Sequence, residues 1–334
     1  MSRPALFFAL LAFAAAALFA ADLAVGSVDL SPGQVWAALS GGCVDPAVRH
    51  IVLNIRLLKA LTALLAGAAL SASGLQMQTL FRNPLAGPYV LGISAGASLG
   101  VAFFLLGMPL LGIEGHSAIR AIGVAGAAWI GSAAVLAVVM AVSRRIHDIM
   151  VILILGIMFG SGIGAVVEIM QYLSSEAALK SFVVWTMGSL GDVTGPQLAL
   201  LAPVVLAGLG CSVFVVKPLN LLLLGESYAR SMGLNVRRTR SLIFLSTVLL
   251  AGTVTAFCGP VGFVGLAVPH VARMLFRSAD HRILMPASML AGAALLLGCD
   301  LLSKLFALPV NSITALTGIP IVILVVVRNR SFFG

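Results

Sequence analysis

The sequence predicts an all-α membrane protein in which about ten transmembrane helices form one domain over residues 1–334. Hydrophobic residues make up 60% of the chain and charged residues 9%, so too few polar side chains are present to cover a water-soluble domain. The apolar residues lie in repeated runs of about twenty, the length of helix that crosses a bilayer core. The alternating pattern of transmembrane β-strands is not found in the sequence.

The apolar runs predict ten crossings, separated by charged and turn-forming residues. In chain order they are 4–25, 57–80, 89–106, 119–142, 149–171, 195–216, 239–258, 261–276, 284–303 and 312–328. The eighth is short and contains Pro269, which favours a tilted or partly re-entrant helix. Residues 175–192 are expected to form a short interfacial helix with Trp185 near the lipid headgroups.

The positions of the basic residues predict the orientation of the chain in the membrane. With the N-terminus in the cytoplasm, 14 of the 20 lysines and arginines lie on the cytoplasmic side and six lie outside. The positive-inside rule therefore predicts a multi-pass inner-membrane protein with both termini in the cytoplasm, and the net charge of +9 does not indicate a nucleic-acid partner. Residues 1–22 are expected to be retained within the first helix. The alternative is a cleaved signal peptide, since Ala20-Ala21-Asp22 resembles a cleavage site.

Ionisable residues are rare in the predicted spans, where they are usually paired or functional. Asp300 is expected to pair with Lys304 one helical turn away. Glu168 either lines an outer cavity or reaches the interface. The histidines and cysteines show no ligand spacing, so neither a metal site nor a catalytic residue is predicted, and the isolated His270 is expected to be structural or interfacial.

The longest predicted cytoplasmic segment is residues 217–240, KPLNLLLLGESYARSMGLNVRRTR, which we call the cytoplasmic loop. Gly225 and Gly233 bracket a short predicted helix, and the loop mixes apolar with charged residues. Leu222, Leu223, Ser227 and Met232 could form its apolar contact surface. Physical reasoning leaves two alternatives open: the loop docks another protein, or it is an interfacial helix between two crossings.

The polar turn that follows the second crossing has the sequence RNPLAG and is called here the inner turn (residues 82–87). Pro84 cannot continue a helix and it biases Asn83 away from helical angles. Non-helical backbone at membrane depth is tolerated where it is buried in protein or lines a water-filled path. The inner turn is therefore either a constriction in a translocation pathway or an ordinary cytoplasmic turn.

Two stripes of glycine recur at four-residue spacing. They are Gly92, Gly96 and Gly100 in the third crossing, and Gly156, Gly160 and Gly164 in the fifth. Small residues at this spacing let helix backbones approach closely in lipid. Tight packing within one subunit is the expected use of both stripes.

Several blocks of the sequence resemble, in order and at family spacing, the FecCD family of ABC importer permeases for iron-siderophore, haem and cobalamin. The blocks are SGLQMQTLFRNPLAGPYVLGISAGASLG, WTMGSL, GESYARSMGL, GPVGFVGLAVPHVARML, DHRILMPAS and TALTGIP. The resemblance runs from about residue 50 to 328. Two places depart from the family pattern: Arg56-Leu57-Leu58-Lys59 stands where the family has R-L-P-R, and the segment 307–311 lacks the acidic residue common there.

The resemblance implies a type II ABC importer permease fold and a set of functional residues. Those implied for ATPase coupling are Leu224, Gly225, Glu226, Ser227, Ala229, Arg230, Gly233 and Leu234. Those implied for the gate and pathway are Asn83, Pro84, Leu85, Ile149, Met150, Gly156 and Gly160. Arg56, Lys59 and Lys304 are implied in docking a periplasmic binding protein, while as flanking cations they could instead anchor helix ends at the headgroups.

The resemblance also implies partners. A second permease subunit, with a homodimer favoured over a heterodimer, would enclose one pathway for ferric siderophore, haem or cobalamin. None of the four lysines follows a glycine, so the chain has no GxxxxGK[ST] phosphate loop. ATP and magnesium would therefore bind two copies of a separate ATPase, and this chain is expected to bind no cofactor and to be no enzyme. The rival interpretation is a secondary transporter driven by an ion gradient, which would need ionisable residues at mid-membrane.

Overall fold

The computed structural model describes the backbone of residues 3–110, 117–143, 145–146 and 148–328, and all regular secondary structure in these ranges is helical. Within the described ranges, seven helices are long and apolar enough to cross a membrane. Three shorter apolar helices, Ile93–Gly107, Val264–Phe276 and Val310–Val325, complete the set of ten predicted crossings. The seven long ones are Pro4–Ala24, Pro46–Leu80, Gly123–Ser143, Ile149–Leu173, Gly195–Phe214, Val236–Cys258 and His281–Phe306.

The centre of the fold is α4 (Leu57–Leu80), which is buried along almost its whole length. It packs against α16 (His281–Phe306), α15 (Val264–Phe276), α10 (Gly195–Phe214) and α13 (Val236–Thr247). Glycines make these approaches possible: a Cβ on Gly67 would overlap the Gly292 carbonyl, and a Cβ on Gly74 would overlap the Gly265 carbonyl. The helices therefore touch backbone to backbone, as small residues allow in membrane proteins.

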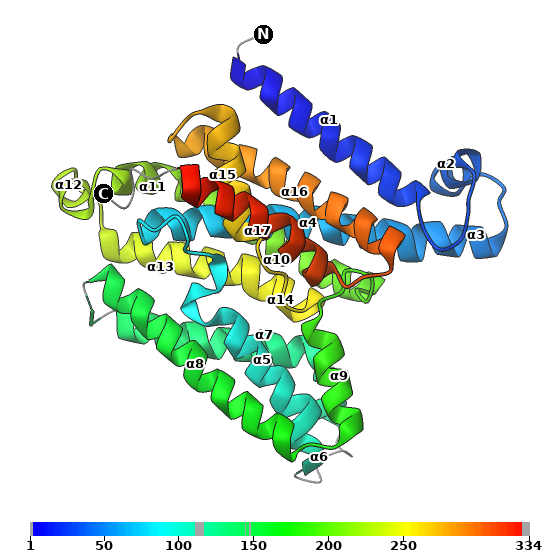
Figure 1. Ribbon diagram of the computed structural model, residues 1–334, viewed down its shortest axis with the longest axis horizontal. Coiled ribbons are helices and arrows are strands. Elements are labelled where there is room, and N and C mark those ends of the chain that lie inside the picture. The colour runs from blue at the N-terminus through cyan, green and yellow to red at the C-terminus, as the bar shows by residue number, and fades with distance from the viewer. Residues whose placement is uncertain (1–2, 111–116, 144, 147, 329–334) are drawn as a thin grey trace.

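A second group of helices lies together at the lower side of the view in Figure 1. It contains α5 (Ile93–Ala102), α7 (Ser117–Ser143), α8 (Ile149–Leu173) and α9 (Glu176–Thr186). On α5, a Cβ at Gly96 would come within 2.6 Å of the Gly131 carbonyl oxygen, and one at Gly100 would overlap that of Ala127. The glycine stripe of the third crossing therefore packs α5 onto α7, as predicted.

The stripe of the fifth crossing is used differently. A Cβ on Gly156 would lie 2.6 Å from the Val90 carbonyl oxygen, whereas one on Gly160 would only just touch its neighbours and one on Gly164 would meet open space. The expectation of tight packing along the whole α8 stripe is therefore wrong at Gly164. The reason is that the packed face of α8 continues through Ile163, Val167 and Met170, and Gly164 lies off that face.

Several predicted boundaries are corrected. The helix of the second crossing starts at Pro46, with α3 (Pro46–His50) and the π-helix η1 (Ile51–Arg56) continuing into α4, so Arg56 lies within a helix instead of before one. The third crossing begins with the 3₁₀-helix η2 (Pro88–Leu91) and ends in the π-helix η3 (Phe103–Gly107). The seventh is interrupted by the π-helix η4 (Val248–Gly252) before α14 (Thr253–Cys258).

In the described part of the chain, the remaining helices are α1 and α17, which form the first and last crossings, and four short helices that connect or flank the crossings. They are α1 (Arg3–Ala24), α2 (Pro32–Ser40), α6 (Met108–Leu110), α11 (Val216–Leu223), α12 (Glu226–Ser231) and α17 (Val310–Arg328). Ser31 caps α2 through a capping box with Gln34, a pattern that sets a helix start at Pro32. The predicted interfacial helix is α9, but Phe182 on it is buried in a cluster with Val101 and Ala256, so α9 packs on the protein as well.

Candidate functional site

The inner turn begins earlier than Pro84 alone would require. Helix α4 ends at Leu80, and Arg82 adopts a left-handed φ of 49°, which breaks the helix two residues before the proline. The Asn83 side chain then accepts a hydrogen bond from the Leu85 backbone N–H (2.8 Å), and the Ala86 N–H donates to the Asn83 carbonyl (3.1 Å). These local bonds fold the backbone into a compact turn that leaves the Leu85 side chain 42% exposed.

The start of α8 is the predicted counterpart of the inner turn. Asp148 caps this helix by accepting a hydrogen bond from the Met150 N–H (2.8 Å), and Met150 is half exposed. Two turns further on, Gly156 contacts the Val90 carbonyl, which belongs to η2 directly after the inner turn. The structure thus brings the first half of α8 against the segment that leads out of the inner turn.

The cytoplasmic loop folds into two short helices, α11 and α12, at the left of Figure 1. The predicted bracketing glycines both need positive φ, with 106° at Gly225 and 83° at Gly233, which glycine adopts without steric cost. On α12 Ala229 is buried, while Tyr228 on this helix and Leu224 and Met232 at its two ends are each at least half exposed. Of the predicted apolar surface, Leu222 is buried instead, because it packs α11 onto the membrane domain.

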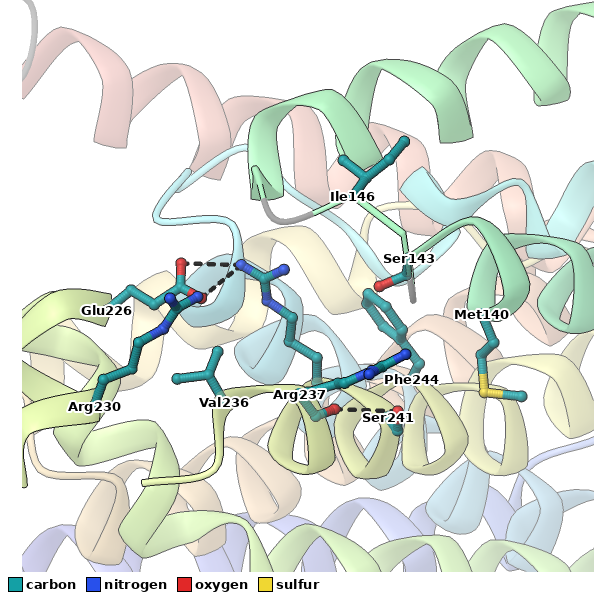
Figure 2. Close-up of a pocket in the computed structure, with 10 residues that line it drawn as sticks. Met140, Ser143, Ile146, Glu226, Arg230, Val236, Arg237, Ser241 and Phe244 are labelled. Atoms are coloured by element: carbon teal, nitrogen blue, oxygen red, sulfur yellow. Dashed lines mark hydrogen bonds and ion pairs between the residues drawn. The ribbon is translucent and has the colours of Figure 1, made fainter. Parts of the chain in front are cut away.

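Glu226 links α12 to α13, the first helix of the seventh crossing. Its carboxylate accepts two hydrogen bonds from the Arg240 guanidinium (2.7 and 2.9 Å) and one from Arg230 one turn away (3.0 Å). Figure 2 shows these contacts at one side of a crevice whose other wall carries Met140, Ser143 and Ile146. A displacement of α12 would therefore be passed directly to α13.

At the outer ends of the helices the three predicted docking cations have partners inside the chain. Lys304 Nζ lies 2.7 Å from Asp22 Oδ1 and 3.2 Å from Asp300 Oδ2, and Lys59 Nζ lies 3.0 Å from Asp300 Oδ1. The predicted pairing of Asp300 with Lys304 is confirmed. Asp22, Lys59, Asp300 and Lys304 are called here the outer charge cluster.

Arg56 performs a separate structural task. Its guanidinium donates hydrogen bonds to the carbonyl oxygens of Leu23 (2.9 Å), Ala24 (2.6 Å) and Val28, and only 4% of the residue is exposed. Leu23 and Ala24 are the last two residues of α1 and Val28 follows it, so Arg56 satisfies acceptors that the helix terminus leaves free. Sequence reasoning missed this role because the outer position of Arg56 indicated a surface cation. The docking role of Arg56, Lys59 and Lys304 stays a prediction.

The sequence also singled out Glu168 and His270. Glu168 is exposed on α8, and His270 donates a hydrogen bond from Nε2 to the Pro84 carbonyl (2.7 Å), a structural role of the predicted kind. Within the described ranges, no three His, Cys, Asp or Glu residues are grouped closely enough to hold a metal ion.

Ten apolar helices, a non-helical turn at the cytoplasmic end and a short cytoplasmic helix with an exposed apolar face define a multi-pass membrane permease. The chain belongs to the FecCD transport family, whose model matches residues 12–328. Permeases of this family reside in the inner membrane, and this chain is an ABC transporter permease subunit.

Curated relatives and a solved structure agree with this assignment. The hemin transport system permease protein HmuU of Yersinia pestis is 36% identical over 315 residues, which cover 92% of this chain and 90% of HmuU. The vitamin B12 import system permease protein BtuC of Klebsiella pneumoniae is 36% identical over 315 residues, covering 92% and 89%. An inward-facing structure assigned to the metal-chelate type of ABC transporter superposes with a TM-score of 0.83 at 28% identity, covering 97% of this chain and 99% of the other. The type II importer permease fold is therefore confirmed.

Proposed function

We propose that this chain is the membrane-spanning subunit through which an ATP-driven importer moves a metal chelate from the periplasm to the cytoplasm. The cargo class is ferric siderophore, haem or cobalamin, and the two curated relatives named above, for hemin and for vitamin B12, are equally similar to this chain. The observation that carries the proposal is α12, a short helix with an exposed apolar face that Glu226 joins to the membrane domain.

In this proposal two copies of a separate ATPase bind α12 of two permease subunits, which enclose one pathway. The ATPases supply ATP and magnesium, and their closure moves α12 and with it α13 and the inner turn. Asn83, Pro84 and Leu85 would form the inner gate together with Ile149 and Met150 at the start of α8. A periplasmic binding protein would deliver the chelate at the outer surface near Arg56, Lys59 and Lys304.

Co-purification tests the coupling surface. The tagged wild-type chain, expressed with its partner ATPase in mild detergent, is expected to retain the ATPase. A Glu226→Ala, Gly233→Trp double variant should lose most of it, because the pairs with Arg230 and Arg240 disappear and tryptophan cannot easily adopt a φ of 83°. Leu224→Glu should weaken retention without touching those pairs, since Leu224 is 63% exposed.

Arg282→Ala is the matched control, because Arg282 is exposed beside the cytoplasmic loop but does not belong to it. It should retain the ATPase like wild type. Uptake of haem, cobalamin and a ferric siderophore into vesicles that contain the whole complex then identifies the cargo. Uptake that follows an ion gradient and needs no ATPase would establish the secondary transporter instead.

A further inference from the structure

A chain of buried and partly buried hydrogen bonds connects the cytoplasmic loop with the inner turn, and the role proposed above for α12 does not use it. It starts at Asn220 on α11, the helix that precedes α12. Asn220 Nδ2 donates to Asp280 Oδ1 (2.6 Å), and the backbone N–H of His281 donates to Asn220 Oδ1 (2.8 Å). These two bonds determine which way the Asn220 amide points.

The orientation of Asn220 determines the hydrogen on the His281 ring. His281 Nδ1 lies 2.7 Å from Asn220 Oδ1, which is an acceptor, so Nδ1 carries the hydrogen and donates it. In the neutral ring Nε2 is then an acceptor, and it lies 2.8 Å from the hydroxyl of Thr79. The Leu75 carbonyl oxygen lies 2.9 Å from the same hydroxyl, so Nε2 and this carbonyl share its single hydrogen. His281 is 1% exposed, so its contact with Thr79 is buried, while its bond to Asn220 is partly buried.

Thr79 and its neighbour Gln78 are where the chain of bonds reaches the inner turn. The Thr79 carbonyl accepts a hydrogen bond from the Arg82 N–H (3.2 Å), and the Gln78 carbonyl accepts one from the Asn83 N–H (3.1 Å). The last turn of α4 therefore sets the position of the first two residues of the inner turn. A shift of Thr79 along the α4 axis would carry the turn with it.

The other side of the inner turn is held by α15. His270 Nε2 donates to the Pro84 carbonyl (2.7 Å), and Arg273 Nη1 donates to Gln78 Oε1 (2.6 Å). Gln78 Nε2 in turn donates to the Leu266 carbonyl (3.0 Å). These bonds attach both the inner turn and the end of α4 to α15. A displacement of α4 would therefore change the lengths and angles of these hydrogen bonds.

We infer that Asn220, His281 and Thr79 form a positioning relay that converts movement of the cytoplasmic loop into movement of the inner turn. Helix α11 packs against both α16 and α4, with Leu219 and Leu222 buried, but apolar contacts alone allow the helices to slide. Hydrogen bonds depend steeply on distance and angle, so the relay keeps α11, the start of α16 and the end of α4 in register. Gly225 connects α12 to α11, so a movement of α12 reaches the relay through this residue. The inference rests on the proposed function, because it assigns the route by which that coupling reaches the gate.

The ratio of cargo imported to ATP hydrolysed, measured on the reconstituted complex, tests the relay. Thr79→Val removes the hydroxyl but keeps the side-chain shape, and it should lower the ratio at least about fivefold, the low end of typical coupling effects. Thr79→Ser keeps the hydroxyl and should preserve the ratio. If Thr79 acted by packing alone, valine would be the harmless substitution and serine the harmful one.

A matched control and a double variant sharpen the result. Thr247→Val removes a buried hydroxyl that donates to Ile243 within its own helix, and it should leave the ratio unchanged. Asn220→Ala should lower the ratio as Thr79→Val does, and combining both should add little, because the two residues belong to one chain of contacts. Fully additive effects would overturn the relay.

A second measurement needs no ATPase and separates the relay from the proposed function. A spin label at Leu85→Cys, in a Cys43→Ser, Cys211→Ala background, reports the mobility of the inner turn. Asn220→Ala should increase that mobility, while Thr247→Val should not. An unchanged label overturns the relay even if ATP-driven import is found. If Asn220→Ala increases the mobility of the label, the relay is supported. If the complex shows no ATP-driven import in the same study, the proposed function is overturned while the relay stands.

Discussion

Replacing Lys304 by methionine is expected to destabilise the protein far more than replacing Lys59. Lys304 is the partner of two buried carboxylates, Asp22 and Asp300, and both of these side chains have no exposed surface. Methionine keeps the unbranched stem but leaves Asp22 without its cation, and breaking a buried pair in this way costs about 3–5 kcal/mol. Lys59→Met leaves Asp300 in contact with Lys304, so its cost should be smaller.

The melting temperature in mild detergent measures this difference, and proteolysis between α1 and α2 shows whether α1 is released. Asp22→Asn added to Lys304→Met should recover part of the loss, because the unpaired charge is then removed. Equal effects of the two lysine substitutions would contradict the assigned geometry of the outer charge cluster. The cluster also affects the proposed docking of a binding protein. Asp22 and Asp300 already neutralise Lys59 and Lys304, so an acidic residue of the partner would have to compete with them.

Replacing Gly74 by alanine is expected to be the most damaging single-methyl change in the core. The new Cβ would overlap the carbonyl of Gly265 on α15, and a backbone atom cannot rotate away as a side chain can. The two helices must separate, at a cost of about 3 kcal/mol, the upper part of the usual range for overpacking. Gly265 also lies against Pro88 directly after the inner turn, so the same change should disturb the turn.

Gly210→Ala is the matched control, because Gly210 is also helical but an added Cβ would meet nothing within 4 Å. It should stabilise the protein by about 0.5–1 kcal/mol through the higher helix propensity of alanine. The two substitutions are chemically identical, and their effects on the melting temperature should have opposite signs. Two effects of the same sign would mean that α4 and α15 do not approach as closely as the structure indicates.

Local patterns in the sequence were sufficient for the class, the topology and the cytoplasmic elements. Apolar runs act through transfer into lipid, which each segment undergoes largely by itself, so the ten apolar helices of the described ranges could be predicted. The orientation indicated by the basic residues stays a prediction. Gly225 and Gly233 marked the ends of α12 because their backbone angles are a local requirement. The pairing of Asp300 with Lys304 was predictable for the same reason, since the two are one helical turn apart.

Tertiary structure decided how distant segments use residues that look alike in the sequence. The stripes Gly92–Gly100 and Gly156–Gly164 have the same spacing, yet the first packs α5 onto α7 and the second meets open space at Gly164. Asp22 and Lys304 form an ion pair across 282 residues, and His270 meets Pro84 across 186. Such contacts depend on the angles and depths at which helices cross. No local periodicity encodes those, because they result from the summed packing of all the helices.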